Sequence, residues 1–275
     1  MNITIHPIRF RHSTAKYSCD ETGIYKGIES VKFLNDKIAD ELYELREYQF
    51  DSFIDLLAKL KTLSVNSRQL DILIKLDFFN EFGEVNKLLK QVEYFDKIYG
   101  KKQFKKAKLA ELNIPLNIAE KYATKVTEKT LTGMDTNGLL NEIVNTTEYP
   151  PTTLMNHFKY EQECLGYVIT IDPSINKRLY YVSAINSTKY LTTITLYEIF
   201  SGKTRQVKMW TSQYSKSRFE VGTILYIISL EKKNKKEPTG EINPETGKKI
   251  YADVPDKFEY WLEKFIVKES LEDDR

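Results

Sequence analysis

The stretch that decides the fold of the first part of the chain is GIYKGIESVKFLNDKIADELYELREYQFDSFIDLLAKLKTLSVNSRQLDILIKLDFFNEFG, residues 23–83. Apolar residues recur in it at the spacing of a helix face, first at Val31, Leu34, Ile38, Leu42 and Leu45. Two further apolar faces follow, and a polar break that ends at Asn66 separates them. The spacing predicts helix, tight turn and helix, given twice, over about 27–46 and about 53–79.

Polar residues at the predicted turns are suited to capping helices and to contacting phosphate. Asn35 is expected to cap the first long helix, and Ser64 or Asn66 the helix after the second turn. A hairpin between paired helices can aim backbone N–H groups at a phosphate, with cations beside it. The candidate phosphate contacts at these turns are Lys32, Asn35, Lys37, Asn66, Ser67 and Arg68. The alternative is a plain helical bundle with solvated lysines.

The middle of the chain holds a block of lysines, KKQFKKAK at 101–108, that contains no acidic residue. Such a block is either a solvated face or a contact to the phosphate backbone. Short helices are expected on both sides of Pro115, and a turn-rich break over 130–137. The candidate phosphate contacts are Lys101, Lys102, Lys105 and Lys106.

Alternation with a period of two replaces the helical spacing in the last part of the chain. Five runs are expected as strands, over 179–185, 192–200, 204–210, 222–230 and 258–267. Five strands with a short helix near 212–218 suit a five-stranded Greek-key barrel that binds single strands through aromatic and cationic side chains. The candidates are Tyr181, Lys189, Tyr190, Tyr197, Lys208, Trp210 and Tyr214, each of which is alternatively a packing residue of its strand.

The first part resembles the tandem helix-hairpin-helix region of the alpha subunit of bacterial and phage DNA polymerase III, a family C polymerase. Helix-hairpin-helix loops usually carry glycines, and Phe33-Leu34-Asn35 stands where they are expected. The second hairpin therefore carries the firmer expectation of a phosphate contact. The residues that carry the resemblance are Gly27-Ile28, Phe50–Phe53, Val65-Asn66, Leu73–Lys75 and Phe79–Gly83.

A second stretch, FKYEQECLGY at 158–167, is similar to the segment that joins the hairpins of those polymerases to their OB-fold domain. The resemblance implies an α+β protein with three parts. These are a tandem helix-hairpin-helix DNA-binding domain over 1–100, a basic helical connector over 101–165 and a five-stranded OB-fold barrel over 166–275.

One short motif suggests a protein partner. Gln91, Tyr94 and Phe95 fit a Gln-x-x-aromatic-Phe pentapeptide, which resembles the peptide by which replicative polymerases bind their sliding clamp. A clamp-binding peptide must be accessible, and the alternative is that the same residues form one face of a core helix.

The resemblance implies DNA binding without catalysis. The catalytic carboxylates of such polymerases belong to a palm domain that no part of this chain resembles, and Asp253, Asp256 and Glu272–Asp274 are expected to be solvated. The leading hypothesis is a non-catalytic part that holds duplex DNA through the hairpins and single-stranded template through the barrel, beside the polymerase catalytic domains. The alternatives are a separately encoded replication-protein interaction module and an enzyme with an unrecognised site.

Composition limits the remaining classes of protein. The 275 residues include 41 Lys and Arg against 39 Asp and Glu, so the chain is not uniformly basic, although a local DNA-binding face stays compatible with this balance. Without an apolar run that spans a membrane or a signal-peptide core, we expect a cytoplasmic protein that contacts no membrane. Two cysteines and three histidines show no metal-ligand spacing, so no cofactor or small-molecule substrate is expected.

Overall fold

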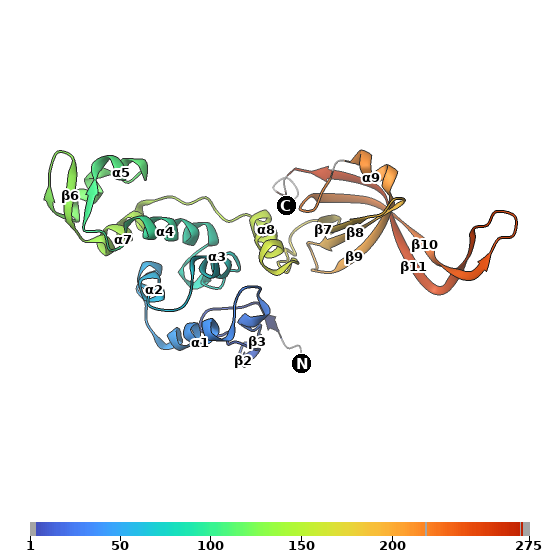
Figure 1. The fold of residues 1–275 in the computed structure, drawn as a ribbon, viewed down its shortest axis with the longest axis horizontal. Coiled ribbons are helices and arrows are strands. Elements are labelled where there is room, and N and C mark those ends of the chain that lie inside the picture. Colours follow the sequence, from blue (N-terminus) through green and yellow to red (C-terminus); the bar gives the residue numbers. More distant parts are fainter. Residues whose placement is uncertain (1–3, 218, 270, 272–275) are drawn as a thin grey trace. The chain divides into compact units, whose positions relative to one another are not determined.

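The computed structural model describes residues 4–217, 219–269 and 271, and the chain forms two compact units, residues 1–153 and 154–275. Helices and sheets occur in both, so the predicted α+β class is confirmed (Figure 1). The expected boundaries at 100 and 165 fall inside these units. Residues 101–153 belong to the first unit because α7 (Thr136–Thr146) packs against α2 (Phe53–Leu60) and α4 (Val85–Ile98).

A small sheet and a set of short helices begin the first unit. Strand β3 (Gly23–Tyr25) pairs in parallel with β1 (Ile5–His6) and antiparallel with β2 (Ser18–Asp20). A cluster of phenylalanines packs the N-terminal segment against the helices, and in it the centre of the Phe10 ring lies 5.9 Å from that of Phe78. The helices that follow are η1 (Ile28–Ser30), α1 (Asp36–Glu44), η2 (Leu45–Glu47), α2, α3 (Ser67–Lys75), η3 (Asn80–Phe82) and α4.

The second predicted helix pair is confirmed as α2 and α3, and the first pair is wrong in its first half. Residues 28–30 form only one 3-10 turn, Val31 is extended, and Phe33 has a positive φ of 71°. Val31 and Leu34 are buried. The chain buries these side chains through a tight turn, so their apolar spacing resembled that of a helix.

A three-stranded sheet with two short helices follows α4. The sheet has the order β4-β6-β5, and all its pairings are antiparallel. The break expected over 130–137 is wrong, because Leu131 lies opposite Phe104 in this sheet and both are buried. The elements are β4 (Gln103–Lys105), α5 (Lys106–Glu111), α6 (Leu116–Lys121), β5 (Ala123–Val126) and β6 (Thr130–Met134).

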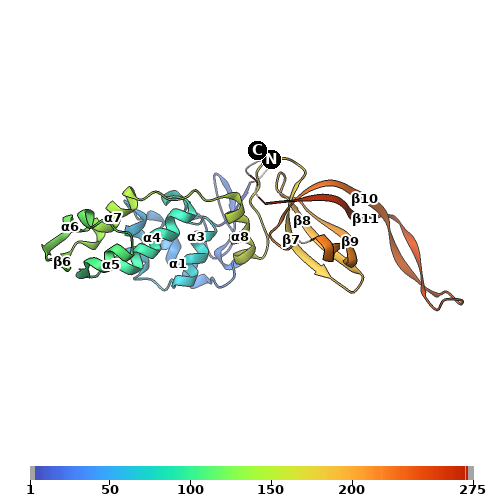
Figure 2. The ribbon, with the colours of Figure 1, turned by 90° about the horizontal axis from the view of Figure 1, so that it is seen from above.

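The second unit has five strands that close into a barrel in the order β10-β11-β9-β8-β7 (Figures 1 and 2). Strands β9 and β11 pair in parallel and the other neighbours antiparallel. Helix α9 (Thr211–Ser217) stands between the third and fourth strands. The strands are β7 (Leu179–Ser187), β8 (Leu191–Glu198), β9 (Thr204–Trp210), β10 (Ile224–Ile242) and β11 (Lys249–Lys268).

A helix covers one outer surface of the barrel. In α8 (Leu154–Leu165), the buried Phe158 ring lies 5.1 Å from that of Tyr181. The buried Glu161 carboxylate accepts hydrogen bonds from the backbone N–H groups of Ile169 at 2.8 Å and Thr170 at 3.0 Å. This part of the stretch 158–167 therefore ties the helix to the chain that enters the barrel.

Strands β10 and β11 are much longer than the others, and their outer halves form a two-stranded ribbon (Figure 2). Pairing continues to Ile242 opposite Lys249, so the polar segment 232–249 forms a paired hairpin. No helix in the described ranges is long and apolar enough to cross a bilayer.

Candidate nucleic-acid interface

Two turns that are distant in the sequence meet at the N-termini of α1 and α3. The Gln69 Nε2 atom donates a hydrogen bond of 3.1 Å to the backbone oxygen of Phe33. The Gln69 Oε1 atom accepts from the backbone N–H of Asn66, and Asn66 Oδ1 accepts from the backbone N–H of Gln69, both at 3.0 Å. This reciprocal pair is a capping box, so one buried glutamine caps α3 and also holds the first turn against it.

The α3 N-terminus is suited to an anion. Of the two predicted caps, Ser64 and Asn66, it is Asn66 that caps α3. The first turn of α3 holds no acidic residue. The N–H groups of a first helical turn lack partners within the helix, and the Asn66 side chain accepts from only one of them. Ser67 and Arg68 are exposed beside them. This end therefore combines backbone donors, a hydroxyl group and a guanidinium group.

The α1 N-terminus is less suited to phosphate. Asn35 caps it as predicted, because its Oδ1 atom accepts from the backbone N–H of Ile38 at 3.0 Å. Asp36 stands in the first turn, and its carboxylate favours cations there. Of the two helix ends, only that of α3 has a first turn without an acidic residue.

The cations at the two turns differ in how far carboxylates neutralise them. Lys37 Nζ lies 3.9 Å from Glu41 Oε1, so part of its charge is paired. Lys32 has no carboxylate partner among the described residues, and its Nζ atom lies 5.2 Å from the centre of the Phe33 ring. The Arg68 guanidinium carbon lies 3.5 Å from the same centre. Lys32 and Arg68 therefore share one exposed aromatic ring between the two turns.

A second link joins the turns through Glu41. Its Oε2 accepts from the backbone N–H of Ser64, and its Oε1 accepts from the Ser64 hydroxyl group, both at 2.7 Å. These hydrogen bonds hold the pKa of Glu41 below its ordinary value, and the bond from the Ser64 backbone has the larger effect. Ser64, the other predicted cap, therefore fixes the turn rather than the helix end.

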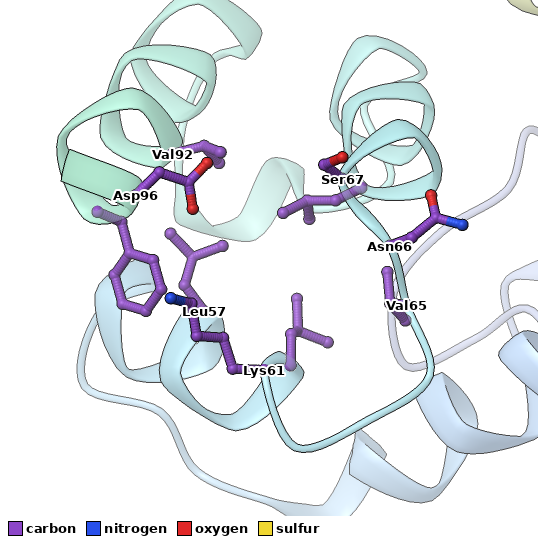
Figure 3. A pocket seen from close by; sticks show the side chains of 10 residues that line it. Leu57, Lys61, Val65, Asn66, Ser67, Val92 and Asp96 are labelled. Atoms are coloured by element: carbon purple, nitrogen blue, oxygen red, sulfur yellow. The ribbon is translucent and has the colours of Figure 1, made fainter. Parts of the chain in front are cut away.

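A hollow of about 150 Å³ lies between α2, α3 and α4, beside the second turn (Figure 3). Leu57, Val65 and Val92 border it, and the Asp96 carboxylate lies at its α4 side. A largely apolar hollow with a carboxylate at its rim does not suit phosphate. The candidate contacts therefore stay on the exposed residues Asn66–Arg68.

The lysine block lies on the three-stranded sheet. Lys105 pairs opposite Thr130, and Thr132 lies between Gln103 and Lys125 in one cross-strand row. Alternation places these side chains on the face opposite to the buried Phe104 and Leu131. Lys102, Lys105, Lys125 and Lys129 have no carboxylate partner within the described ranges. Lys125 was not among the predicted contacts, because its proximity to the block depends on the pairing of β5 with β6.

Two lysines of the block are less available. Lys106 Nζ binds Glu120 Oε1 at 2.6 Å, and Lys101 Nζ donates to the backbone oxygen of Lys97 at 2.6 Å. The exposed cations of the block are therefore chiefly Lys102 and Lys105.

The clamp-binding hypothesis is wrong for this conformation. Gln91, Tyr94 and Phe95 lie within helix α4, and all three are buried. A clamp peptide has to offer these side chains to a pocket on its partner. These three residues instead form part of the buried face of a core helix, as the alternative interpretation predicted.

Two of the predicted aromatic contacts of the barrel are also wrong. Tyr181 and Tyr197 are only 3% and 2% exposed, because Phe158 of α8 covers them. The Tyr197 hydroxyl group donates to the backbone oxygen of Thr170 at 2.9 Å, and burial raises its pKa to about 12. Neither ring can stack on a base there.

Trp210 is exposed, and the structure gives it a partner that the sequence analysis missed. Its ring centre lies 4.9 Å from that of Trp261, and Lys233 Nζ lies 4.6 Å from the Trp261 ring centre. An open hollow of about 450 Å³ adjoins both rings. Trp261 stands between the inward-facing Tyr260 and Leu262, so strand alternation already indicated that it faces outward.

Lys208 lies beside the tryptophans and is already paired. Its ammonium group contacts Glu259, whose Oε1 also accepts from Trp261 Nε1 at 2.8 Å. Burial disfavours the charged carboxylate, but the hydrogen bonds from Lys208 and Trp261 outweigh it and hold the pKa of Glu259 below its ordinary value. Lys208 therefore orients the tryptophan face and has little free charge for phosphate.

The remaining barrel candidates flank Trp210, because the backbone N–H of Thr211 donates to the backbone oxygen of Tyr190 at 3.0 Å and Tyr214 lies in α9, which follows Trp210. Lys189 and Tyr190 are in the turn between β7 and β8, and Tyr190 is 67% exposed. Lys189 Nζ lies 5.2 Å from the centre of that ring. Tyr214 of α9 donates its hydroxyl group to the backbone oxygen of Phe219 at 3.0 Å and packs against the core.

The carboxylates considered for metal binding do not gather. Among the described residues, no three His, Cys, Asp or Glu side chains are placed to hold a metal ion. Asp253 is exposed on the ribbon and Asp256 is close to it in the chain. Glu272–Asp274 lie outside the described residues.

In the first unit, short turns join successive helices, as between α2 and α3. A family model described as a helix-hairpin-helix motif matches residues 2–89, which include α1, α3 and both turns. The match supports a DNA-binding helix-hairpin-helix domain in the N-terminal part and ends before the lysine block. No curated protein matches the chain.

Proposed function

We propose that the first unit binds the sugar–phosphate backbone of double-stranded DNA through the N-terminus of α3. The observation that carries this is the capped, acid-free helix end with Arg68 beside it, within the matched motif. The first turn, with Lys32, adds a second cation at the same surface.

The sheet face with Lys105 and Lys125 extends this contact along the backbone. Its lysines and threonines offer hydrogen bonds without an acidic residue in any of the three strands. Contacts of this kind depend on charge and not on base sequence, so affinity falls with salt and sequence preference is slight.

The second unit binds single-stranded DNA in this proposal. Its strand order, the parallel β9–β11 pairing and the helix between the third and fourth strands support an OB fold. The exposed Trp210 and Trp261, with Lys233 beside them, provide stacking surfaces and a cation.

Duplex binding by the first unit and single-strand binding by the second suit a non-catalytic part of a DNA polymerase III alpha subunit. Support comes from the order of the parts, hairpins first and barrel last, and from the resemblance over residues 23–83 and 158–167. In this proposal, the chain holds the duplex and guides the template while catalytic domains extend the primer.

A titration of the purified chain with single-stranded, double-stranded and primed DNA at several salt concentrations tests the proposal. We expect binding to all three, tightest for primed DNA, with affinity that falls steeply as salt rises. Absence of duplex binding at low salt would contradict the hairpin assignment, and absence of single-strand binding would contradict the barrel assignment. A primer-extension assay with Mg²⁺ tests the assignment of the chain as non-catalytic.

A further inference from the structure

Phe33 combines a costly backbone conformation with an exposed aromatic ring. Its φ is 71°, in the left-handed region, and the residue is 47% exposed. For a bulky residue this region costs about 1–2 kcal/mol, whereas glycine adopts it freely. A side chain that is strained and also exposed gains too little from burial to explain its position.

The other residues with positive φ have ordinary explanations. Asp77, Asn113 and Asp256 belong to the residue types that tolerate this region. Arg11 uses it to place its guanidinium group, which donates to Glu81 Oε1 at 2.9 Å and to the backbone oxygens of Arg46 and Tyr48. Among the described non-glycine residues with positive φ, Phe33 alone is apolar.

The neighbours of Phe33 fix its ring at the surface. Val31 and Leu34 on either side are buried, and Gln69 binds the Phe33 backbone oxygen at 3.1 Å. Arg68 lies over the ring at 3.5 Å, and Lys32 lies at 5.2 Å. The ring is therefore held between two cations that suit DNA phosphates.

We infer that the Phe33 ring stacks on an unstacked nucleobase of the bound DNA. This inference rests on the proposed duplex binding by the same turns. A planar ring beside backbone-binding cations stacks readily on a base, and the energy of unstacking is smallest where a base is already unpaired. The ring therefore favours DNA with a gap, a mismatch or a primer end over continuous duplex.

Phe33→Gly tests this inference because it removes the ring and also relieves the backbone. The full chain is titrated with an intact hairpin duplex and with the same duplex carrying a single-nucleotide gap. We expect the natural chain to prefer the gapped DNA by about tenfold, the order of one stacked base. The variant should lose this preference, so that it binds the gapped and the intact duplex with nearly equal affinity, and it should melt no lower than the natural chain.

Two further variants keep the test decisive if the glycine variant folds poorly. Phe33→Trp should retain the preference for gapped DNA, and Phe33→Leu, which keeps an apolar side chain without a π face, should lose it. Equal preference in the natural chain and in Phe33→Leu would overturn the inference, as would a natural chain that binds both DNAs equally. A natural chain that binds neither DNA would instead contradict the proposed function.

Discussion

The side chain of Gln69 donates a hydrogen bond of 3.1 Å to the backbone oxygen of Phe33, 36 residues earlier in the chain. The same side chain closes the capping box of α3. One residue thus sets the distance between the two turns that we propose to contact DNA.

Gln69→Ala should destabilise the first unit by about 1–2 kcal/mol, because it removes a cap partner and leaves a backbone oxygen unpaired. Gln69→Glu keeps the capping acceptor but turns a carboxylate oxygen toward the Phe33 backbone oxygen in a buried site, so its loss should be larger at neutral pH. Urea unfolding followed by helical circular dichroism measures both. Both tryptophans lie in the second unit, so an unchanged fluorescence transition is the internal control, and equal losses in the two variants would contradict the assignment.

The planar contact between Arg68 and Phe33 predicts that arginine and lysine are not equivalent at this position. Arg68→Ala should weaken duplex binding and reduce the salt slope by about one. Arg68→Lys should restore the slope, which counts charges, but only part of the affinity, because an ammonium group lacks the flat guanidinium surface. Full recovery with lysine, measured by fluorescence anisotropy over a salt series, would show that the stacked geometry is irrelevant to binding.

Glu41 gives the first unit a pH dependence at acid pH. Its pKa is lowered in the folded state, so its contribution is present above its ordinary value of 4.5 and is lost as pH falls through the lowered pKa. Glu41→Gln should therefore be less stable than the natural chain at neutral pH, and the difference should shrink below pH 4.5. Asp253→Asn is the control for charge removal elsewhere. A difference that stays constant with pH would mean that the bonds to Ser64 do not depend on the ionised carboxylate.

The tryptophan pair predicts where single-stranded DNA contacts the barrel. Trp210→Ala and Trp261→Ala should each weaken single-strand binding by about 1–3 kcal/mol, and duplex binding by the first unit should not change. Tyr251→Ala, which removes an exposed ring from the outer ribbon, is the matched control. If Tyr251→Ala weakens single-strand binding as much as either tryptophan variant, the contact lies on the ribbon and not on the barrel.

Features fixed by neighbouring residues were predictable from the sequence. The caps Asn35 and Asn66 depend on hydrogen bonds to backbone only three residues away, and the barrel strands showed their alternation directly. The first predicted helix was a turn, because burial of Val31 and Leu34 and the link from Gln69 come from distant parts of the chain.

The candidate barrel site shows the same limit. Alternation placed Tyr181 and Tyr197 on the outer surface of the barrel, but α8 covers that surface, and no local pattern reveals the covering helix. Likewise, Lys125 joins the lysine block only through pairing of β5 with β6. The tryptophan pair arises from the parallel pairing of β9 and β11, which is equally distant in the sequence.

The salt dependence of duplex binding tests the central claim most directly. It compares the natural chain, the triple variant Lys32→Ala, Lys37→Ala, Arg68→Ala, and a control in which the carboxylate-paired Lys90, Lys97 and Lys108 are changed to Ala. Both variants lose three positive charges. We predict a steep slope for the natural chain, a slope smaller by about two to three in the hairpin variant, because Glu41 pairs part of the Lys37 charge, and a much smaller change in the control. Equal weakening in both variants, or binding that ignores salt, would contradict the claim that the hairpins hold the DNA backbone.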